Sequence, residues 1–216
     1  GGTNIGAGNE INGLTLGAVG STTSISNVEI VANQDDGIEW FGGSANITNA
    51  LVWNVGDDAI DTDQAWNGVL DDFIVVNPVG SCFELDGPEG DDDAYFMSDR
   101  DPLNHNLKNG TIYVGNSPSA ADFDDDTNVD MEAVYFYGFD DDENSQEVQG
   151  FAGMANGTMT NIEVTAGAGF TAAEIFVDVP GANYTEVAEG SNSVGSTADY
   201  SWTWASQSGA LAGIGL

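Results

Sequence analysis

An internal repeat of 22 or 23 residues constrains the fold of this chain more than any other feature. The pattern of alternating apolar residues around an Asn or Asp begins at Ile25 (ISNVEIV), Ile47 (ITNALVW) and Leu70 (LDDFIVV). Looser copies begin at Leu107, Met131 and Met159. Short strands that recur at this period are typical of stacked coils. We therefore predict an all-β chain that folds as a right-handed parallel β-helix, a solenoid, with irregular acidic insertions and a non-repetitive C-terminal segment.

Each repeat contains a second strand. Alignment of NQDDGIEWFGG, NVGDDAIDTDQ and NPVGSCFELDG predicts one column of inward side chains, Ile38, Ile60 and Phe83. Because neighbouring side chains of a strand point to opposite faces, the next positions form an outward column. This predicted acidic column consists of Glu39, Asp61 and Glu84.

Asparagine also recurs in register. Asn27 and Asn49 occupy one position of the repeat, and Asn33, Asn54 and Asn77 are aligned at a turn. Asparagine tolerates unusual backbone angles, and its amide can bond from coil to coil. Both columns are expected at bends between strands.

The repeat also predicts the domain organisation. Residues 1–171 form the β-helix, with acidic insertions at about 87–106, 115–130 and 140–157, and residues 172–216 form a C-terminal strand, cap or assembly segment. The early segment NGLTLGAVG aligns with the second strand of a repeat, so the chain begins halfway round a coil. An open coil exposes unpaired backbone groups. We expect a longer precursor or another subunit to cover it, and a homo-oligomer or polymer to form through this end and the uncharged C-terminal tail.

The charge balance limits the partners. The chain has 36 acidic residues against Arg100 and Lys108, a formal net charge of −34. This charge disfavours nucleic acid and anionic membranes as partners, and no apolar run is long enough to span a bilayer. Salt, metal ions or raised carboxylate pKa values must relieve the repulsion. We therefore expect an extracellular or cell-surface location in a saline or calcium-rich medium.

Stacked carboxylates point to calcium. Coils lie about 4.8 Å apart, so adjacent charges of the acidic column repel by about 3 kcal/mol at an effective dielectric near 20. Calcium takes six to eight oxygen ligands, whereas zinc prefers His and Cys, of which the chain has only His105 and Cys82. A buried, inert thiol is expected for Cys82. We predict Ca²⁺ as the bound ion, with a solvated acidic face and loosely held sodium as the alternative, and these ligands: Asp36, Glu39, Asp58, Asp61, Asp63, Glu84 and Asp86.

Two insertions offer further calcium ligands at alternate positions. DDDTNVD contains Asp124, Asp126, Asn128 and Asp130, and DDDEN contains Asp140, Asp142 and Asn144. The first is not an EF-hand, because Val129 stands where the tight turn needs Gly, and Tyr135 stands where Glu is required. The alternative is that both are acidic solubilising loops.

Other surface features leave two interpretations open. The N-x-T sequons at Asn46, Asn109, Asn156 and Asn183 are glycosylation candidates or chance matches. Trp40, Trp53 and Trp66 either form a sugar-binding strip or fill the core.

Catalysis is not expected. GDDAID from Gly56 resembles the paired Asp of polygalacturonases, but β-helix lyases use Arg or Lys as the base, and the hydrolases add a His and a basic cluster. Arg100, Lys108 and His105 are too few, and the negative field repels acidic polysaccharides. We predict no catalytic residues and no organic cofactor.

The runs NEINGLTLGAVGS, DDGIEWFGGSANITNALVWNVGDDAIDTDQAWNG and SWTWASQSGAL resemble secreted β-helix proteins and lipoproteins of Bacteroidota and marine proteobacteria. The resemblance covers about the first 90 residues and the tail, whereas the middle, about 91–157, departs from it. Members of this family mostly have unassigned functions, so the resemblance implies fold and location rather than activity. We expect an extracellular structural protein, a self-associating filament or surface-layer subunit stabilised by calcium. The alternatives are a calcium-dependent adhesin or glycan-binding module, and then a polysaccharide-active enzyme.

Overall fold

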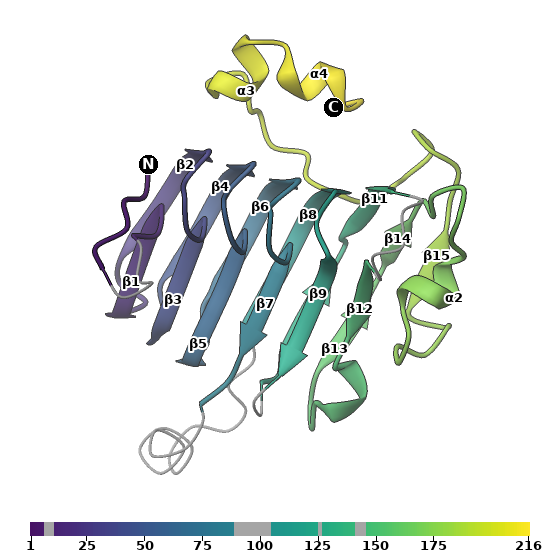
Figure 1. The fold of residues 1–216 in the computed structure, drawn as a ribbon. Helices are drawn as coiled ribbons and strands as arrows, with labels where there is room; N and C mark the ends of the chain where they lie inside the picture. Colours follow the sequence, from purple (N-terminus) through teal and green to yellow (C-terminus); the bar gives the residue numbers. More distant parts are fainter. Residues whose placement is uncertain (7–10, 89–104, 125–126, 141–145) are drawn as a thin grey trace.

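The chain forms a parallel β-helix in which successive strands alternate between two sheets (Figure 1). The computed structural model describes residues 1–6, 11–88, 105–124, 127–140 and 146–216. The first sheet has six strands in the order β1 (Leu14–Val19), β3 (Ile38–Gly43), β5 (Ile60–Trp66), β7 (Phe83–Asp86), β9 (Ser119–Asp124) and β12 (Glu147–Gln149).

The second sheet has nine strands. Its main path runs through β2 (Ser24–Val31), β4 (Asn46–Trp53), β6 (Val69–Val76), β8 (His105–Gly115), β11 (Tyr135–Phe139), β14 (Ile162–Val164) and β15 (Tyr184–Glu186). Beside this path, β10 (Val129–Glu132) pairs with β8 and with β13 (Thr158–Thr160). Every strand pairing among the described residues is parallel, which confirms the predicted β-helix.

The observed register confirms the sequence repeat. In the six-stranded sheet Leu14, Ile38, Ile60 and Phe83 are partners in successive strands. In the nine-stranded sheet the partners in one column are Ile25, Ile47, Leu70, Leu107, Met131 and Met159. The weaker copies therefore occupy the same position in the coil as the strong ones.

One asparagine column is confirmed, and the other is wrong at its first member. Asn27 and Asn49 both have a positive φ, and the Asn49 amide donates to Asn27 Oδ1 at 3.2 Å. At the turn, however, Ala32 rather than Asn33 is equivalent to Asn54 and Asn77, because Val31 pairs with Trp53. Asn33 instead lies one position later, where its amide donates to the Asp36 carbonyl at 3.0 Å.

Large apolar side chains fill the space between the sheets. Trp40 and Trp66 are fully buried with ring centroids 4.6 Å apart, so these two tryptophans belong to the core and cannot stack on a sugar. Edge-to-face aromatic contacts continue the core along the helix through Phe73, Phe83, Phe136 and Phe176. Cys82 is buried as expected, and burial raises the pKa of its thiol to about 12.

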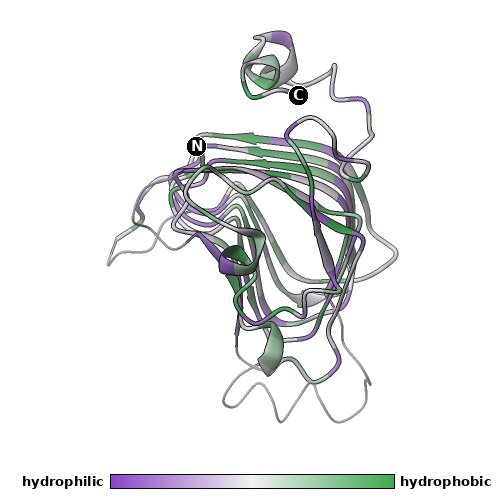
Figure 2. Ribbon diagram, turned by 90° about the vertical axis from the view of Figure 1, so that its right-hand side faces the viewer, coloured by the Kyte–Doolittle hydropathy of each residue, from purple (hydrophilic) through white to green (hydrophobic). Residues whose placement is uncertain are grey.

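The C-terminal residues cover two different surfaces. The short helix α2 (Ala172–Ile175) buries Ala172 and Ile175 in the core, beyond the 3-10 turn η1 (Phe151–Gly153). The helices α3 (Trp204–Gln207) and α4 (Ala210–Gly213) lie outside the nine-stranded sheet (Figures 1 and 2). There they form a second apolar cluster with the outward side chains of that sheet; its buried members are Leu51, Ile74, Val76, Tyr200, Ala205 and Leu211. No helix in the described ranges is long and apolar enough to cross a bilayer.

Candidate cation-binding site

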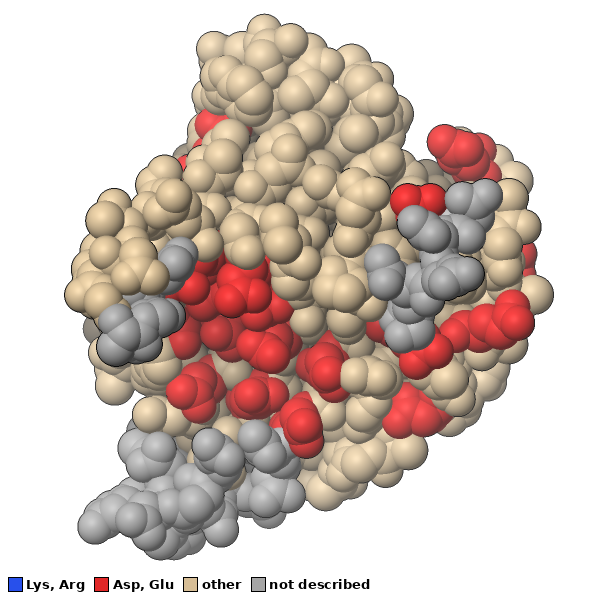
Figure 3. All heavy atoms as spheres, in the orientation of Figure 1, with Lys and Arg blue, Asp and Glu red and all other residues tan. Residues whose placement is uncertain are grey.

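The acidic column lies on the outer face of the six-stranded sheet. Register places Glu39 beside Asp61, and Asp61 beside Glu84, on β3, β5 and β7. Alternation along each strand sends these side chains outward while Ile38, Ile60 and Phe83 point into the core. Figure 3 shows acidic side chains gathered in the middle of this face. Although it points outward, Glu39 is only 8% exposed, so its carboxylate is partly dehydrated.

The turn before these strands holds a second acidic column that runs through Asp36 and Asp58. Asp36 Oδ1 accepts a hydrogen bond from the Asp58 amide at 3.1 Å, and Asp58 Oδ1 accepts one from the Ser81 amide in the next coil. Each carboxylate therefore binds the backbone of the following coil and helps to set the coil spacing. Gly37, which follows Asp36, has no room for a side chain, because a Cβ there would collide with the Ala59 carbonyl.

The two columns meet and form the candidate cation site. Carboxylate oxygens of Asp36, Glu39 and Asp61 lie within 4.8 Å of one another, and so do those of Asp35, Asp36 and Asp57. Asp36 belongs to both groups and links them. Carboxylate oxygens at this spacing on a partly buried surface can share one hard cation. The structure therefore brings together three of the predicted ligands.

The electrostatics of the site favour either protons or a cation. Burial, reinforced by the neighbouring carboxylates, raises the pKa of Asp61 to about 10 and that of Glu84 to about 8. Burial likewise raises the pKa values of Asp36 and Glu39 to about 7, although the bond from the Asp58 amide opposes the shift at Asp36. Four neighbouring carboxylates therefore resist carrying full negative charge at neutral pH unless positive charge enters.

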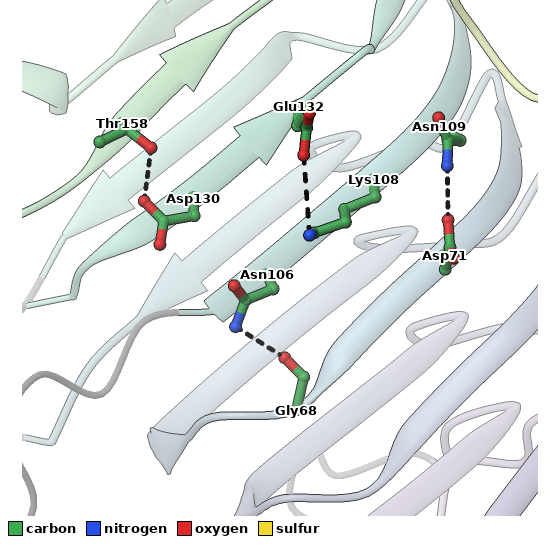
Figure 4. A network of polar contacts seen from close by, with 8 residues as sticks. All are labelled: Gly68, Asp71, Asn106, Lys108, Asn109, Asp130, Glu132 and Thr158. Carbon is green, nitrogen blue, oxygen red and sulfur yellow. Dashed lines mark hydrogen bonds and ion pairs between the residues drawn. The ribbon is translucent and has the colours of Figure 1, made fainter.

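Side-chain cations do not supply that charge in the described part of the chain. Lys108 is its only Lys or Arg, and the Lys108 ammonium group lies 3.6 Å from Glu132 on β10, in the other sheet (Figure 4). Glu39 instead has a neutral polar partner, the Asn12 amide, which donates to Glu39 Oε2. His105 is buried beside Thr62, and burial lowers its pKa to about 3, so it is neutral and faces the core.

The remaining ligands predicted on this face surround the three central carboxylates. Asp63 contributes to the raised pKa of Glu39, and Asp58 and Asp86 contribute to that of Glu84. Asp63 Oδ1 also accepts a hydrogen bond from the Gln64 amide at 2.8 Å. They form a negative rim around the candidate site.

The insertion residues lie elsewhere. Asn128 Oδ1 accepts from the Asn156 amide at 2.7 Å, and Asp130 Oδ1 accepts from the Thr158 hydroxyl at 2.5 Å (Figure 4). These bonds link neighbouring coils.

Asp124 is exposed at the end of β9, and Asp140 follows β11, where its amide donates to Gln146 Oε1 at 2.8 Å. Asp126, Asp142 and Asn144 lie outside the described residues.

The four sequons differ in how their amide groups are used. The Asn109 side-chain nitrogen donates to Asp71 Oδ1 at 2.7 Å, and that of Asn183 donates to the Met159 carbonyl at 2.9 Å. Asn46 and Asn156 are exposed. Because a glycan is attached through the side-chain nitrogen, Asn46 and Asn156 are the more accessible of the four candidates.

The predicted ligand set left out three residues at the site: Asn12, Asp35 and Asp57. Asp35 and Asp57 directly precede Asp36 and Asp58 in the chain. Asn12 occupies the same turn column as Asp36 and Asp58, one coil earlier. The signal was available, because Asn12 precedes Gly13 as Asp36 precedes Gly37. The acidic pairs before β3 (Asp35 and Asp36) and β5 (Asp57 and Asp58) were therefore readable as one feature.

Comparisons with known proteins agree with this fold. The family described as pectate-lyase-like β-helix domains matches residues 1–207. Neither the comparison with curated proteins nor the one with solved structures found a match. The match spans nearly the whole chain, and so the protein belongs to the family of pectate-lyase-like β-helix domains.

Proposed function

We propose that this protein is an extracellular structural β-helix whose acidic face binds Ca²⁺ and requires it for full stability. The observation that carries the proposal is the convergence of Asp36, Glu39 and Asp61, whose oxygens lie within 4.8 Å of one another and whose pKa values are all raised. A divalent cation neutralises two charges at once and accepts oxygen ligands in flexible geometry. Binding to the folded state alone stabilises that state.

A structural role is favoured over catalysis by the composition of the site. The lyases of this fold class need a strong base beside the substrate, and the described residues place no Lys, Arg or exposed His at the acidic face. The surrounding Asp63, Glu84 and Asp86 would also repel a polyuronate. The carboxylates instead serve the stack itself, as the bonds from the Asp58 and Ser81 amides illustrate.

Self-association is the second part of the proposal. In the described residues β1 and β2 are the end strands of the two sheets, whereas α2 covers the core at the opposite end. Edge strands present unpaired backbone groups that can pair with another chain. We propose that β1 and β2 pair with a further copy and that the uncharged C-terminal tail docks on a neighbour, so that a filament or layer forms. Sedimentation velocity with and without Ca²⁺ tests this association. A monomer under both conditions, at every concentration, contradicts this part.

Calcium titration of the metal-free protein tests the main proposal. Isothermal titration calorimetry should show binding at neutral pH, and saturating Ca²⁺ should raise the unfolding temperature. Asp61→Asn removes a central ligand, so the affinity should fall at least about tenfold, a loss of about 1.4 kcal/mol. The matched control is Glu186→Gln, which changes an exposed carboxylate on β15 and should bind as the wild type does. Equal affinity in both variants, or no binding, would refute the site.

A further inference from the structure

We propose that a groove beside the C-terminal segment binds a neutral oligosaccharide. The groove has a volume of about 500 Å³ and adjoins a second hollow of about 280 Å³; both are lined by Tyr113, Gly138 and Phe139. It lies where β4, β6, β8 and β11 end, on the side of the molecule that carries α3 and α4 (Figure 1). It is therefore on the other sheet from the acidic column, and its volume is typical of small-molecule sites.

A column of outward side chains forms one wall of the groove. Register aligns Trp53, Val76, Tyr113 and Tyr137 on four successive coils. Two coils separate Trp53 from Tyr113, about 10 Å, which suits an oligosaccharide in which every second sugar ring stacks on an aromatic face. Trp53 is the one predicted strip tryptophan that lines this groove, since Trp40 and Trp66 fill the core.

The aromatic wall is held in place from behind. The Tyr137 ring packs edge-to-face against Tyr113 with centroids 5.3 Å apart, and the Tyr137 hydroxyl donates to the Ile214 carbonyl at 3.0 Å. Tyr137 is only 5% exposed, so it supports the wall, whereas Tyr113 is half-buried and remains accessible. Ile214 brings the C-terminal segment to the groove as a further lining.

Two glycines make room for the groove's side chains. Gly138 has φ 73°, and a Cβ there would collide with the Tyr113 ring. Gly115 has φ 63°, and a Cβ there would collide with the Asn77 amide. A side chain at either position would displace an aromatic ring or an amide that lines the groove.

Amide groups supply the polar contacts. The Asn77 amide donates to Asn54 Oδ1 at 2.9 Å, and the Asn116 amide donates to Asn77 Oδ1 at 3.2 Å. Asn54 and Asn116, at the two ends of this chain of amides, are exposed. An amide both donates and accepts hydrogen bonds, as a sugar hydroxyl does. A row of amides beside aromatic rings therefore matches the mixed polar and apolar surface of a saccharide.

The charge of the lining decides which saccharide fits. Asp140 and Glu189 are the charged residues that line the two hollows, and none of the described lining residues is Lys, Arg or His. Uronates and sulfated sugars would meet only negative charge there. The ligand class is therefore a neutral oligosaccharide.

Titration of the full chain with oligosaccharides tests this inference. The probes are the neutral hexasaccharides of cellulose, xylan, mannan, chitin and laminarin, with oligogalacturonate as the charged comparison, followed by calorimetry and tryptophan fluorescence. At least one neutral probe should bind with Kd below about 1 mM, and oligogalacturonate should bind at least tenfold more weakly. Trp53→Ala should weaken binding at least tenfold.

Two further variants keep the test sharp. Asn116→Ala changes an exposed side chain of the groove and should also weaken binding without altering the unfolding temperature. Trp204→Ala is the matched control, because Trp204 is a 53% exposed tryptophan on α3 that is not among the groove residues; it should bind as the wild type does. Absence of binding by every neutral probe, preference for oligogalacturonate, or binding that survives Trp53→Ala and Asn116→Ala overturns the inference. Capture of a proline-rich peptide in place of sugars would overturn it too.

Discussion

The effect of a single residue in this protein depends on the column to which it belongs. One column of the nine-stranded sheet has a positive φ on every coil, from the coil of β2 to the coil that contains β13 and β14. Asn or Asp occupies every position of this column except Ala133. These residues tolerate left-handed backbone at low cost, so the repeated bend selects them. The members are Asn27, Asn49, Asp72, Asn109, Ala133 and Asn161.

Gly37 illustrates how closely the coils approach each other. A Cβ at Gly37 would collide with the Ala59 carbonyl of the next coil and would also crowd Val52. Gly37→Ala should therefore lower the free energy of unfolding by about 1–3 kcal/mol, as overpacking does. The control is Gly17→Ala, where nothing lies within 4 Å of the added Cβ and a change below about 0.5 kcal/mol is expected. Urea unfolding of both variants measures the difference, and equal midpoints would contradict it.

At the scale of elements, the C-terminal helices depend on one carboxylate of β2. Glu29 accepts hydrogen bonds from the Trp204 and Ala205 amides at 2.8 and 2.9 Å, at the start of α3. Tyr200 adds a bond to the Asp72 carbonyl at 2.7 Å. These contacts hold an uncharged segment over Leu51 and Ile74, which would otherwise be exposed on the outer face of the sheet.

Glu29→Ala should loosen this segment without unfolding the β-helix. Loss of a charged acceptor at a helix start costs about 1 kcal/mol, and that loss falls on α3 and α4 alone. Chymotrypsin, which cleaves after aromatic residues, should then cut at Trp202 or Trp204 several-fold faster than in the wild type. Glu186→Ala is the control and should leave the rate unchanged. An unaltered rate in Glu29→Ala would mean that the apolar contacts hold the segment by themselves.

At the scale of the whole molecule, stability follows the balance between protons and cations on the acidic face. The folded pKa values of Asp61 and Glu84 are about 10 and 8, well above those of free carboxyl groups. Between the unfolded and folded pKa values the folded protein holds protons that the unfolded chain releases, so rising pH favours unfolding. His105 acts oppositely, since it stays neutral when folded, but its effect is confined to the range below about pH 6.5.

The metal-free protein should therefore lose stability between about pH 7 and pH 9. We expect a loss of at least about 1 kcal/mol, because one carboxyl group that stays protonated only in the folded state contributes about 1.4 kcal/mol for each pH unit crossed. Saturating Ca²⁺ should remove most of this loss, and Asp61→Asn should flatten the metal-free profile. Urea midpoints at the two pH values measure these effects. A metal-free midpoint that rises with pH would contradict the burial of charge at this site.

The sequence by itself determined the β-helix, because a period of 22 or 23 residues admits stacked coils and little else. It also determined which side chains share a column, since Ile38, Ile60 and Phe83 followed from alignment alone. It placed Asn33 in the wrong column, because the alignment matched residue type: the three turns have the same length, and Ala32 stands where Asn54 and Asn77 do.

Only the tertiary structure decided how much water reaches each column. Glu39 and Asp61 were predicted as an outward row, yet both are partly shielded from water, which a repeat does not specify. Trp53 and Trp66 are a second example. Both are near strand ends, but Trp53 lines a groove whereas Trp66 fills the core. Periodicity specifies the neighbours along the stack, whereas exposure depends on segments outside the period that fold over it.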